Sequence, residues 1–406
     1  MTSIWRRVVF AFLARLKRGH LVLRDPEGRK HAFGGRFPGG TAAIDVHDEA
    51  FFKQAALGGE IGFGEAYTEG LWTSPDLVAV FSLFLTNQDL KSTLHLPGFL
   101  DGLLKRALGF RSRRNTLKGS KDNIEAHYDL SNELFCRFLD PSMTYSCAVF
   151  DRGQDLEASQ QRKLAMIADK ARLQPGDRVL EIGCGWGSFM LEAVSRGCAV
   201  SAVTLSENQA AWVQDMIDKG RLQDSASVSV QDYRSIEQTF DAVVSIEMLE
   251  AVGHEYHPSF FKAVDRALKP GGRAVIQVIT INDQRYPGYR WEGDWIRKHI
   301  FPGGLLPCLA RISDVLQKHT SLIISHVEAI GPHYATTLAL WRKRFLDRAS
   351  ELEGCGFDKR FQRMWTYYLS LCEAGFRSGH INDLQIVLER PWCVDAGLHS
   401  GSSYET

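Results

Sequence analysis

The sequence predicts an α/β fold in which helices cover both faces of a mainly parallel sheet. Between residues 177 and 281, five short apolar segments alternate with segments of helical pattern. Such alternation is typical of parallel sheets, whose crossover connections are helices. The first unit, Val179-Leu-Glu-Ile-Gly-Cys-Gly-Trp-Gly-Ser-Phe189, reads as a strand, a glycine turn and a helix start. That arrangement lets a ligand approach bare backbone beside a helix N-terminus.

Composition narrows the classes of protein to which the chain can belong. Its 406 residues suggest two or three domains, and its 48 basic and 48 acidic residues give no global charge that would favour nucleic acid. The eight cysteines include no C-x-x-C pair, which favours reduced thiols in a cytosol over disulfides or a zinc site. His254 and His257 lack a third ligand nearby, so we expect no metal.

The N-terminal segment is amphipathic. Its apolar run, Val8 to Ala14, is too short to span a bilayer and lacks a cleavage signature, so we expect no signal peptide. Residues 4–19 fit a helix with an apolar and a basic face, formed by Trp5, Val8, Val9, Phe12 and Leu16 and by Arg6, Arg7, Lys17 and Arg18. The basic face either docks on an anionic membrane or is solvated while the helix packs on its own domain. Phe10 interrupts the polar face, which favours the second interpretation.

The rest of the first domain is predicted to end in a linker. Residues 20–65 read as a small β-rich unit, and a helix follows Ser74-Pro75-Asp76 and extends through Phe84. A second helix is expected over 96–108. The basic segment 111–121, broken by a glycine, reads as a linker. We therefore divide the chain into a first domain (1–118), a second domain (119–391) and a flexible tail (392–406).

The second domain contains the alternating elements. Strands are predicted at 177–182, 199–205, 228–230, 240–246, 273–281 and 384–388. Helices are predicted at 156–171, 188–196, 257–268, 335–353 and 357–374, with a further helix that begins after Ser206 as N-cap. Gly197 is placed to cap the C-terminus of the helix predicted at 188–196. Residues 269–272 read as a turn.

The glycine turn favours a cationic ligand. Its pattern is G-x-G-x-G and not the G-x-G-x-x-G of dinucleotide binders, and Glu181 at the strand end would repel a pyrophosphate. A ligand with hydroxyls and a positive charge fits better, which points to S-adenosylmethionine. Polar residues at the other strand ends, Thr204, Asp232 and Glu247, should face the same crevice. An ordinary glycine turn without a ligand is the alternative.

Five motifs occur in an order that carries a family resemblance. They are His127-Tyr-Asp-Leu-Ser-Asn132, Thr144-Tyr-Ser-Cys147, Glu181-Ile-Gly-Cys-Gly-Trp-Gly187, Met248-Leu-Glu-Ala-Val-Gly253 and His299-Ile-Phe-Pro-Gly-Gly304. Together they resemble the cyclopropane-fatty-acyl-phospholipid synthase family, which includes the mycolic acid cyclopropane synthases, over residues 120–391. The resemblance implies a Rossmann-like class I methyltransferase fold with a mostly parallel seven-stranded sheet and a smaller N-terminal α+β domain. It makes the first domain lipid- or membrane-associated and the second catalytic.

The resemblance also implies a set of residues that contact the donor, S-adenosylmethionine. Tyr145 and Ser146 would come from a lid loop, and Gly183, Gly185 and Gly187 would pass close to the methionine part. Glu181 belongs to the same motif. Thr204, Leu205 and Gln209 would lie along the ribose, and Asp232 and Tyr233 would contact adenine. For two of these, plain alternatives are packing of Tyr233 and solvation of Gln209 on a helix surface.

The implied reaction adds a one-carbon unit to the cis double bond of a phospholipid acyl chain. An alkene is a poor nucleophile and the reaction passes through a carbocation, so the site must align the donor and exclude water. In the family a bound bicarbonate is the base, and Cys147, Glu250, Tyr334 and the backbone of Ile279 match the positions that hold it. Glu250 would also offset the cation's charge. Its alternative role is that of a carboxylate at a helix start, and that of Cys147 is a small buried residue.

The roles of Gln277 and Cys372 in the reaction have more than one interpretation. Many relatives have a histidine where this chain has Gln277, which can donate a hydrogen bond but cannot titrate. Cys372 matches a cysteine sometimes regarded as catalytic, although a cysteine at helical spacing is usually buried filler.

The remaining alternatives are a C-methyltransferase that makes a methyl- or methylene-branched acyl chain, a small-molecule N-methyltransferase, and a lipid-binding protein without activity. The expected partner is an unsaturated phospholipid. We expect a cytoplasmic protein that contacts the inner face of the membrane peripherally, with a homodimer as a candidate assembly.

Overall fold

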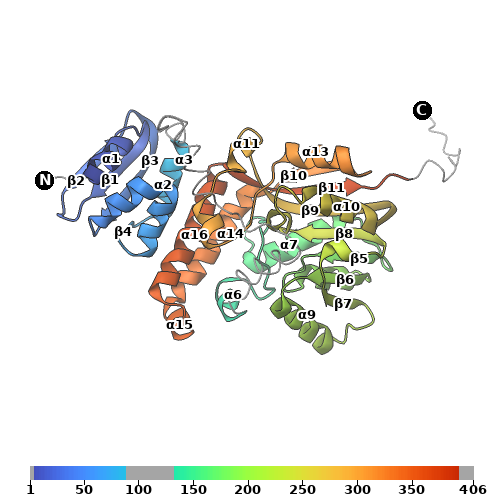
Figure 1. Cartoon of the computed structure of the whole chain (residues 1–406). Coiled ribbons are helices and arrows are strands. Elements are labelled where there is room, and N and C mark those ends of the chain that lie inside the picture. Colours follow the sequence, from blue (N-terminus) through green and yellow to red (C-terminus); the bar gives the residue numbers. More distant parts are fainter. Residues whose placement is uncertain (1–3, 88–131, 393–406) are drawn as a thin grey trace.

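The computed structural model describes residues 4–87 and 132–392. A small N-terminal part lies at one end of the molecule, and a part built on a larger sheet lies at the other (Figure 1). The predicted helix at 96–108, the linker at 111–121, the domain boundary at 118 and nearly all of the motif at 127–132 lie outside the described residues, as does the tail from 393.

A four-stranded sheet and three helices form the N-terminal part. The strands follow the order β2-β1-β3-β4 and comprise β1 (Arg18–Arg24), β2 (Lys30–Gly34), β3 (Phe37–Val46) and β4 (Trp72–Thr73). The helices are α1 (Ile4–Leu13), α2 (Ala50–Thr68) and α3 (Leu77–Thr86). The helix predicted after Asp76 is confirmed, and the Asp76 carboxylate caps it by accepting a hydrogen bond from the Ala79 N–H at 3.0 Å.

The prediction of β structure through residue 65 is wrong for its last part, which is helix α2. The phenylalanines of this helix pack on an aromatic centre: Phe51 and Phe63 contact the buried Trp72 at ring-centroid distances of 6.3 and 4.3 Å. Tertiary burial of these rings stabilises a helix that contains four glycines and has little local helix propensity.

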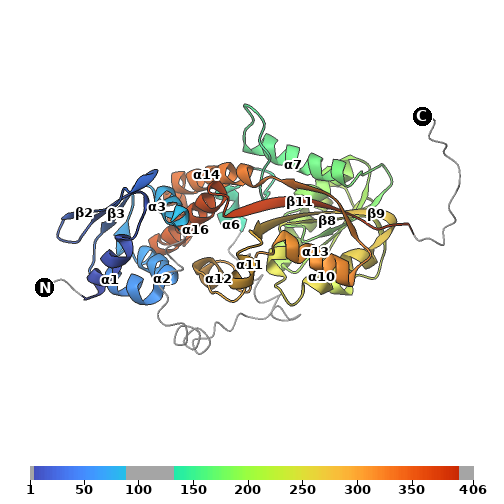
Figure 2. The same cartoon turned by 90° about the horizontal axis from the view of Figure 1, so that it is seen from above.

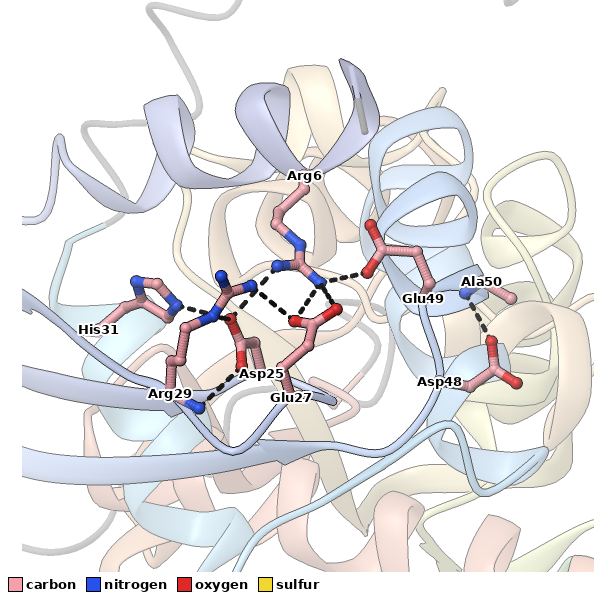
Figure 3. Close-up of polar contacts among 8 residues, drawn as sticks. All are labelled: Arg6, Asp25, Glu27, Arg29, His31, Asp48, Glu49 and Ala50. Atoms are coloured by element: carbon pink, nitrogen blue, oxygen red, sulfur yellow. Dashed lines mark hydrogen bonds and ion pairs between the residues drawn. The ribbon is translucent and has the colours of Figure 1, made fainter. Parts of the chain in front are cut away.

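Of the four basic residues predicted on one face of the first helix, only Arg6 turns inward: Arg7 is exposed on α1, and Lys17 and Arg18 are exposed beyond its end at Leu13. Arg6 is buried and its guanidinium binds the carboxylates of Asp25, Glu27 and Glu49 (Figure 3). Phe10 packs on the same side, 5.3 Å from the ring of Phe33. The prediction for Arg6 is wrong because three carboxylates from other elements compensate its charge, so that it can point inward.

Asp25 lies at the centre of this network. Its carboxylate also accepts hydrogen bonds from the Arg29 side chain and the His31 ring, each at 2.9 Å (Figure 3). Burial alone would raise the pKa of Asp25, but the hydrogen bonds from His31 and Arg29 outweigh burial and hold the pKa well below its ordinary value. The network therefore ties α1 to the β1–β2 turn and to the start of α2.

The large sheet has seven strands in the order β10-β11-β9-β8-β5-β6-β7. The strands are β5 (Arg178–Ile182), β6 (Ala199–Thr204), β7 (Ala226–Val230), β8 (Phe240–Ile246), β9 (Leu268–Ile281), β10 (Ile323–Ala329) and β11 (Ile381–Glu389). β11 runs antiparallel to both of its neighbours, and the other pairings are parallel. The six strands predicted in this region are confirmed to within a few residues, and so is the α/β fold.

Helices cover both faces of this sheet (Figure 2). One face carries α7 (Leu156–Lys170), α8 (Ser188–Ser195) and α9 (Glu207–Gly220), and the other carries α10 (His257–Ala267) and α13 (Leu309–His319). Successive residues of β5 point to opposite faces of the sheet. Val179 packs on the side of α7, α8 and α9, and Leu180 packs on the side of α10 and α13. Ser206 caps α9 as predicted, by accepting a hydrogen bond from the Gln209 N–H at 3.2 Å.

Three features of the second part differ from the predictions. β10 and α13 were not predicted; β10 is an edge strand whose residues are mostly exposed, so it lacks the apolar alternation that marks a strand. Residues 269–272, predicted as a turn, lie within β9 at a register shift against β8. The predicted helix at 335–353 is two helices, α14 (Gly331–Asp347) and α15 (Ala349–Gly354).

Helix α16 (Lys359–Arg377) joins the two parts of the molecule. In both views it lies beside α14 and between the N-terminal part and the large sheet (Figures 1 and 2). Its buried Tyr367 contacts the rings of Phe81 at 4.8 Å and Trp295 at 4.5 Å. Short helices complete this region: α6 (Asn132–Phe138), α11 (Tyr286–Tyr289) and α12 (Trp295–His299).

The Arg6 network predicts that Arg6→Met destabilises the protein although the side chain keeps its length. Asp25 retains Arg29 and His31, so the loss should be that of one charged hydrogen-bond partner, about 1–3 kcal/mol in the free energy of unfolding. Urea denaturation of the full chain measures it. The exposed neighbour Arg7→Met is the matched control and should change stability by less than about 0.5 kcal/mol. Equal losses for the two variants would contradict the assigned role of Arg6.

Candidate active site

A pocket opens at the carboxyl ends of the central strands. Strand β5 is flanked by β6 and β8, so the chain crosses in opposite directions on its two sides. Ligands of open α/β sheets bind at such a switch point. The residues that line the pocket include Tyr145, Ser146, Glu181, Gly183, Gly185, Thr204, Leu205, Gln209, Asp232, Tyr233 and Glu247. Ten of the eleven residues predicted to contact the donor are therefore brought together.

The glycine turn forms one wall of the pocket. Gly183 has φ 80° and Gly185 has φ 53°, both in the left-handed region that favours glycine. A Cβ added to Gly185 would enter open space, so the bare backbone leaves room for a ligand there. Gly187 does not line the pocket; it caps α8, and a Cβ there would meet the Met216 side chain at 2.6 Å. The role of Gly187 is thus to start the helix.

Further pocket-lining side chains are positioned by contacts with neighbouring residues. Gln209 is buried and lies 2.9 Å from the Thr204 hydroxyl, so the alternative of a solvated helix residue is wrong. The Asp232 carboxylate accepts hydrogen bonds from the Arg234 backbone and side chain at 2.9 and 2.8 Å. Tyr233 both lines the pocket and packs on Phe260 at 5.4 Å, so packing and ligand contact are compatible.

Glu181 and Lys163 face the pocket from its floor. Glu181 is buried, and its Oε2 atom has no hydrogen-bond partner among the described residues. Burial raises the pKa of Glu181 to about 8, although the nearby Lys163 and the Met190 N–H favour the ionised form. The Lys163 ammonium donates to the Ser146 hydroxyl at 2.7 Å, and burial lowers its pKa. A buried carboxylate with one oxygen left unpaired among the described residues is suited to a cationic ligand with N–H or O–H donors.

Lys163 was missed in the sequence. The signal was its position on the buried face of α7, which also carries Leu156, Gln160, Leu164 and Ile167. A lysine on an otherwise buried helix face is rare unless a charged or polar partner receives it.

A second group of polar residues lies beside the pocket. The Glu247 carboxylate accepts hydrogen bonds from the Cys147 N–H at 2.8 Å, the Gln277 side-chain amide at 2.8 Å and the Tyr334 hydroxyl at 2.6 Å. These three residues were predicted as catalytic. All three donate hydrogen bonds to Glu247, which was predicted only as a polar residue at a strand end. The donors assigned to bicarbonate thus contact a carboxylate of the chain itself.

Glu250 lies behind Glu247 in the short 3-10 helix η3 (Leu249–Ala251). It does not line the pocket, and its carboxylate accepts a hydrogen bond from the Ile279 N–H, so two groups predicted to hold a bicarbonate contact each other. Its other oxygen is buried with no partner in the described part of the chain. Burial, and secondarily Glu247, raise the pKa of Glu250 to about 8.

Comparison with known proteins adds an independent line of argument. The family model for mycolic acid cyclopropane synthetase matches residues 115–386. A tuberculostearic acid methyltransferase of Mycobacterium tuberculosis is 38% identical over 396 residues, which cover 93% of this chain and 90% of that protein. The cyclopropane-fatty-acyl-phospholipid synthase of Escherichia coli is 36% identical over 365 residues, 88% of this chain and 90% of that one.

The chain belongs to the mycolic acid cyclopropane synthetase family. A solved mycolic acid cyclopropane synthase, complexed with SAH and CTAB, superposes with a TM-score of 0.62 at 32% identity and covers 66% of this chain and 98% of its own. The protein is an S-adenosylmethionine-dependent methyltransferase of the class I fold, and S-adenosylmethionine is its co-substrate. The open space at Gly185 and the partnerless Glu181 oxygen fit that molecule.

The two cysteines predicted as catalytic are poorly suited to act as thiolates in this family member. Burial raises the pKa of Cys147 well above its ordinary value, and its Sγ donates to the Ala148 carbonyl at 3.2 Å. Burial likewise raises the pKa of Cys372, which lies on α16 and does not line the pocket. Cys147 contributes its backbone N–H, and Cys372 contributes packing.

Gly185→Val tests the donor pocket. The variant places a β-branched residue at φ 53° and fills the space left by the glycine, so S-adenosylmethionine should bind at least 10-fold more weakly. Isothermal calorimetry measures the affinity. Gly356→Val is the matched control, since Gly356 also has positive φ (90°) and open space but lies in the exposed α15–α16 loop; it should bind the donor normally. A normal affinity for the Gly185 variant would refute the assignment.

Proposed function

We propose that the protein transfers a methylene group from S-adenosylmethionine to the cis double bond of an unsaturated phospholipid acyl chain, forming a cyclopropane fatty acid. The observation that carries this proposal is the buried polar group beside the donor pocket, in which Glu247, Glu250 and the fully buried Asp383 lie together. An alkene that attacks a sulfonium becomes a carbocation, and the Glu247 carboxylate, which three donors hold beside the pocket, would lower the free energy of such a cation.

Aromatic rings on the same side of the pocket support a carbocation reaction. Tyr145 lines the pocket and lies 5.2 Å from Trp341 and 5.1 Å from Phe135. The ring of Tyr334, whose hydroxyl contacts Glu247, stacks on Phe376 at 4.5 Å. The faces of aromatic rings attract cations, and their apolar edges exclude water. This environment suits an acyl chain better than a soluble amine, which argues against the small-molecule N-methyltransferase.

A second candidate is methyl or methylene branching of the acyl chain. It is favoured by the similarity to a tuberculostearic acid methyltransferase and by Gln277, which replaces the histidine of many relatives. The cyclopropane ring and the methylene branch require the same methyl transfer and the same loss of a proton, whereas a saturated methyl branch also requires a reductant. The first two differ in the fate of the cation, since the electron pair released with the proton closes a ring or forms a double bond.

Expression in a host that lacks cyclopropane fatty acids tests the proposal. We expect phospholipid acyl chains heavier by one CH₂ than their monounsaturated precursors, detected by mass spectrometry. Fragmentation and resistance to hydrogenation distinguish a ring from a methylene branch. Lipids identical with and without the protein, despite normal binding of S-adenosylmethionine, would reject acyl chains as the substrate.

We further propose that α1 contacts the membrane, through a face different from the one predicted. No helix in the described ranges has the length and apolar composition needed to cross a bilayer. The exposed face of α1 carries Ile4, Arg7, Val8 and Ala11, with Ile4 68% and Val8 45% exposed. Exposed aliphatic side chains beside a cationic one are typical of helices that lie in the membrane interface.

Replacing Ile4 and Val8 together by Asp should weaken sedimentation with vesicles of anionic phospholipid by at least 10-fold, because apolar area is lost and negative charge is added. Leu346→Asp is the matched control: Leu346 is 45% exposed on α14 and should leave binding unchanged. Undiminished binding of the double variant would place the contact elsewhere.

A further inference from the structure

The Glu247 carboxylate occupies a site built from three donors on three segments of the chain. Both of its oxygens are engaged: Oε1 accepts from the Cys147 N–H and the Gln277 amide, and Oε2 accepts from the Tyr334 hydroxyl. The three donor residues are buried, with Cys147 and Gln277 fully so. Such a set of converging donors fixes the position of an anion in a dry site.

The backbone of Glu247 is strained. Its φ of 50° lies in the left-handed region, which a side chain with a Cβ rarely adopts. A hydrogen bond from its N–H to the Gln277 carbonyl at 2.8 Å holds the turn in place. Strain of this kind persists only where the surroundings enforce it, and it is concentrated at functional sites. Here it turns the carboxylate from the end of β8 toward both the three donors and the donor pocket.

Of Glu247 and its two side-chain donors, Gln277 and Tyr334, only Glu247 can accept a proton. Gln277 is a neutral amide whose orientation is fixed, because its oxygen accepts from Gln385 at 3.0 Å and its nitrogen also donates to Asp383 at 3.0 Å. The Tyr334 hydroxyl is a donor, and burial raises its pKa well above the ordinary value. Neither can take up a proton at neutral pH.

The neighbouring carboxyls differ from Glu247. Glu250 Oε2 and Asp383 Oδ1 have no hydrogen-bond partner among the described residues, whereas both oxygens of Glu247 are bound. Burial raises the pKa values of Glu250 and Asp383, which favours their neutral forms. An anion is stabilised where donors converge on it, and the three donors described above converge on Glu247.

We propose that Glu247 is the built-in base of the reaction and takes the position of an exogenous anion such as bicarbonate. The inference rests on the proposed function. The π electrons of the alkene form a bond to the donor methyl carbon as the S–CH₃ bond breaks, which gives S-adenosylhomocysteine and a carbocation. Glu247 then removes one proton from the added methyl group. The electron pair of that C–H bond closes the ring or forms a double bond, and the proton leaves Glu247 for solvent after product release.

Two substitutions at Glu247 test this role, in assays with vesicles of unsaturated phospholipid and buffer depleted of bicarbonate. Glu247→Gln keeps the shape and removes the base, so kcat should fall about 100-fold or more. Glu247→Gly relieves the strain at φ 50°, which offsets part of the cost of leaving its hydrogen-bond donors unpaired, so the variant should still fold. It also frees the three donors, so added bicarbonate or formate should restore part of its activity. Both variants should bind S-adenosylmethionine with an affinity close to that of the parent.

Several results separate this inference from the proposed function. Parent protein that loses activity when bicarbonate is removed, or a Glu247→Gln variant with the parent kcat, would overturn the role of Glu247 while leaving acyl-chain methylation intact. Parent protein that forms no lipid product under any condition would instead reject the proposed function. Glu353→Gln, an exposed position on α15, controls for the substitution and should match the parent.

Discussion

Burial of charge at the carboxyl ends of β5, β8 and β9 is the constraint on which the active site depends. Glu181 and Asp383 are buried and Glu247 and Glu250 are half-buried, and an ionised group in such a place is costly unless it is paired or hydrogen-bonded. Lys163 supplies a nearby positive charge, and backbone N–H groups and amides supply the remaining partners. A cationic donor adds a further positive charge beside Glu181, whose second oxygen has no partner in the described part of the chain.

The surrounding fold serves to hold those partners in register. β9 presents Gln277 and the Ile279 N–H on successive inward positions, and β11 places Asp383 and Gln385 beside them through antiparallel pairing. α14 brings Tyr334 over the same point, and α16 packs against α14 and against the N-terminal part. The N-terminal part therefore contacts α16, whose Phe376 stacks on Tyr334.

Membership of the family establishes the donor and the fold, and the tertiary structure adds a contact between Gln277 and Glu247. Gln277 is a neutral amide that cannot titrate, and it donates to the Glu247 carboxylate. An amide on β9 is thus paired with a carboxylate that follows β8, 30 residues away in sequence. The pair keeps an anion and its hydrogen-bond donors together while it makes the anion part of the chain.

The sequence by itself determined the elements whose signals are local. The glycine turn, the capping residues Asp76 and Ser206 and the six predicted strands follow from turn chemistry and from apolar patterning, which act between near neighbours. The family resemblance added the donor-contacting residues. Only the tertiary structure decided that Arg6 points inward and that Glu247 receives Cys147, Gln277 and Tyr334, which are 100, 30 and 87 residues away. Partners so distant meet through strand register and helix docking, and local patterns do not encode which donor will face which carboxylate.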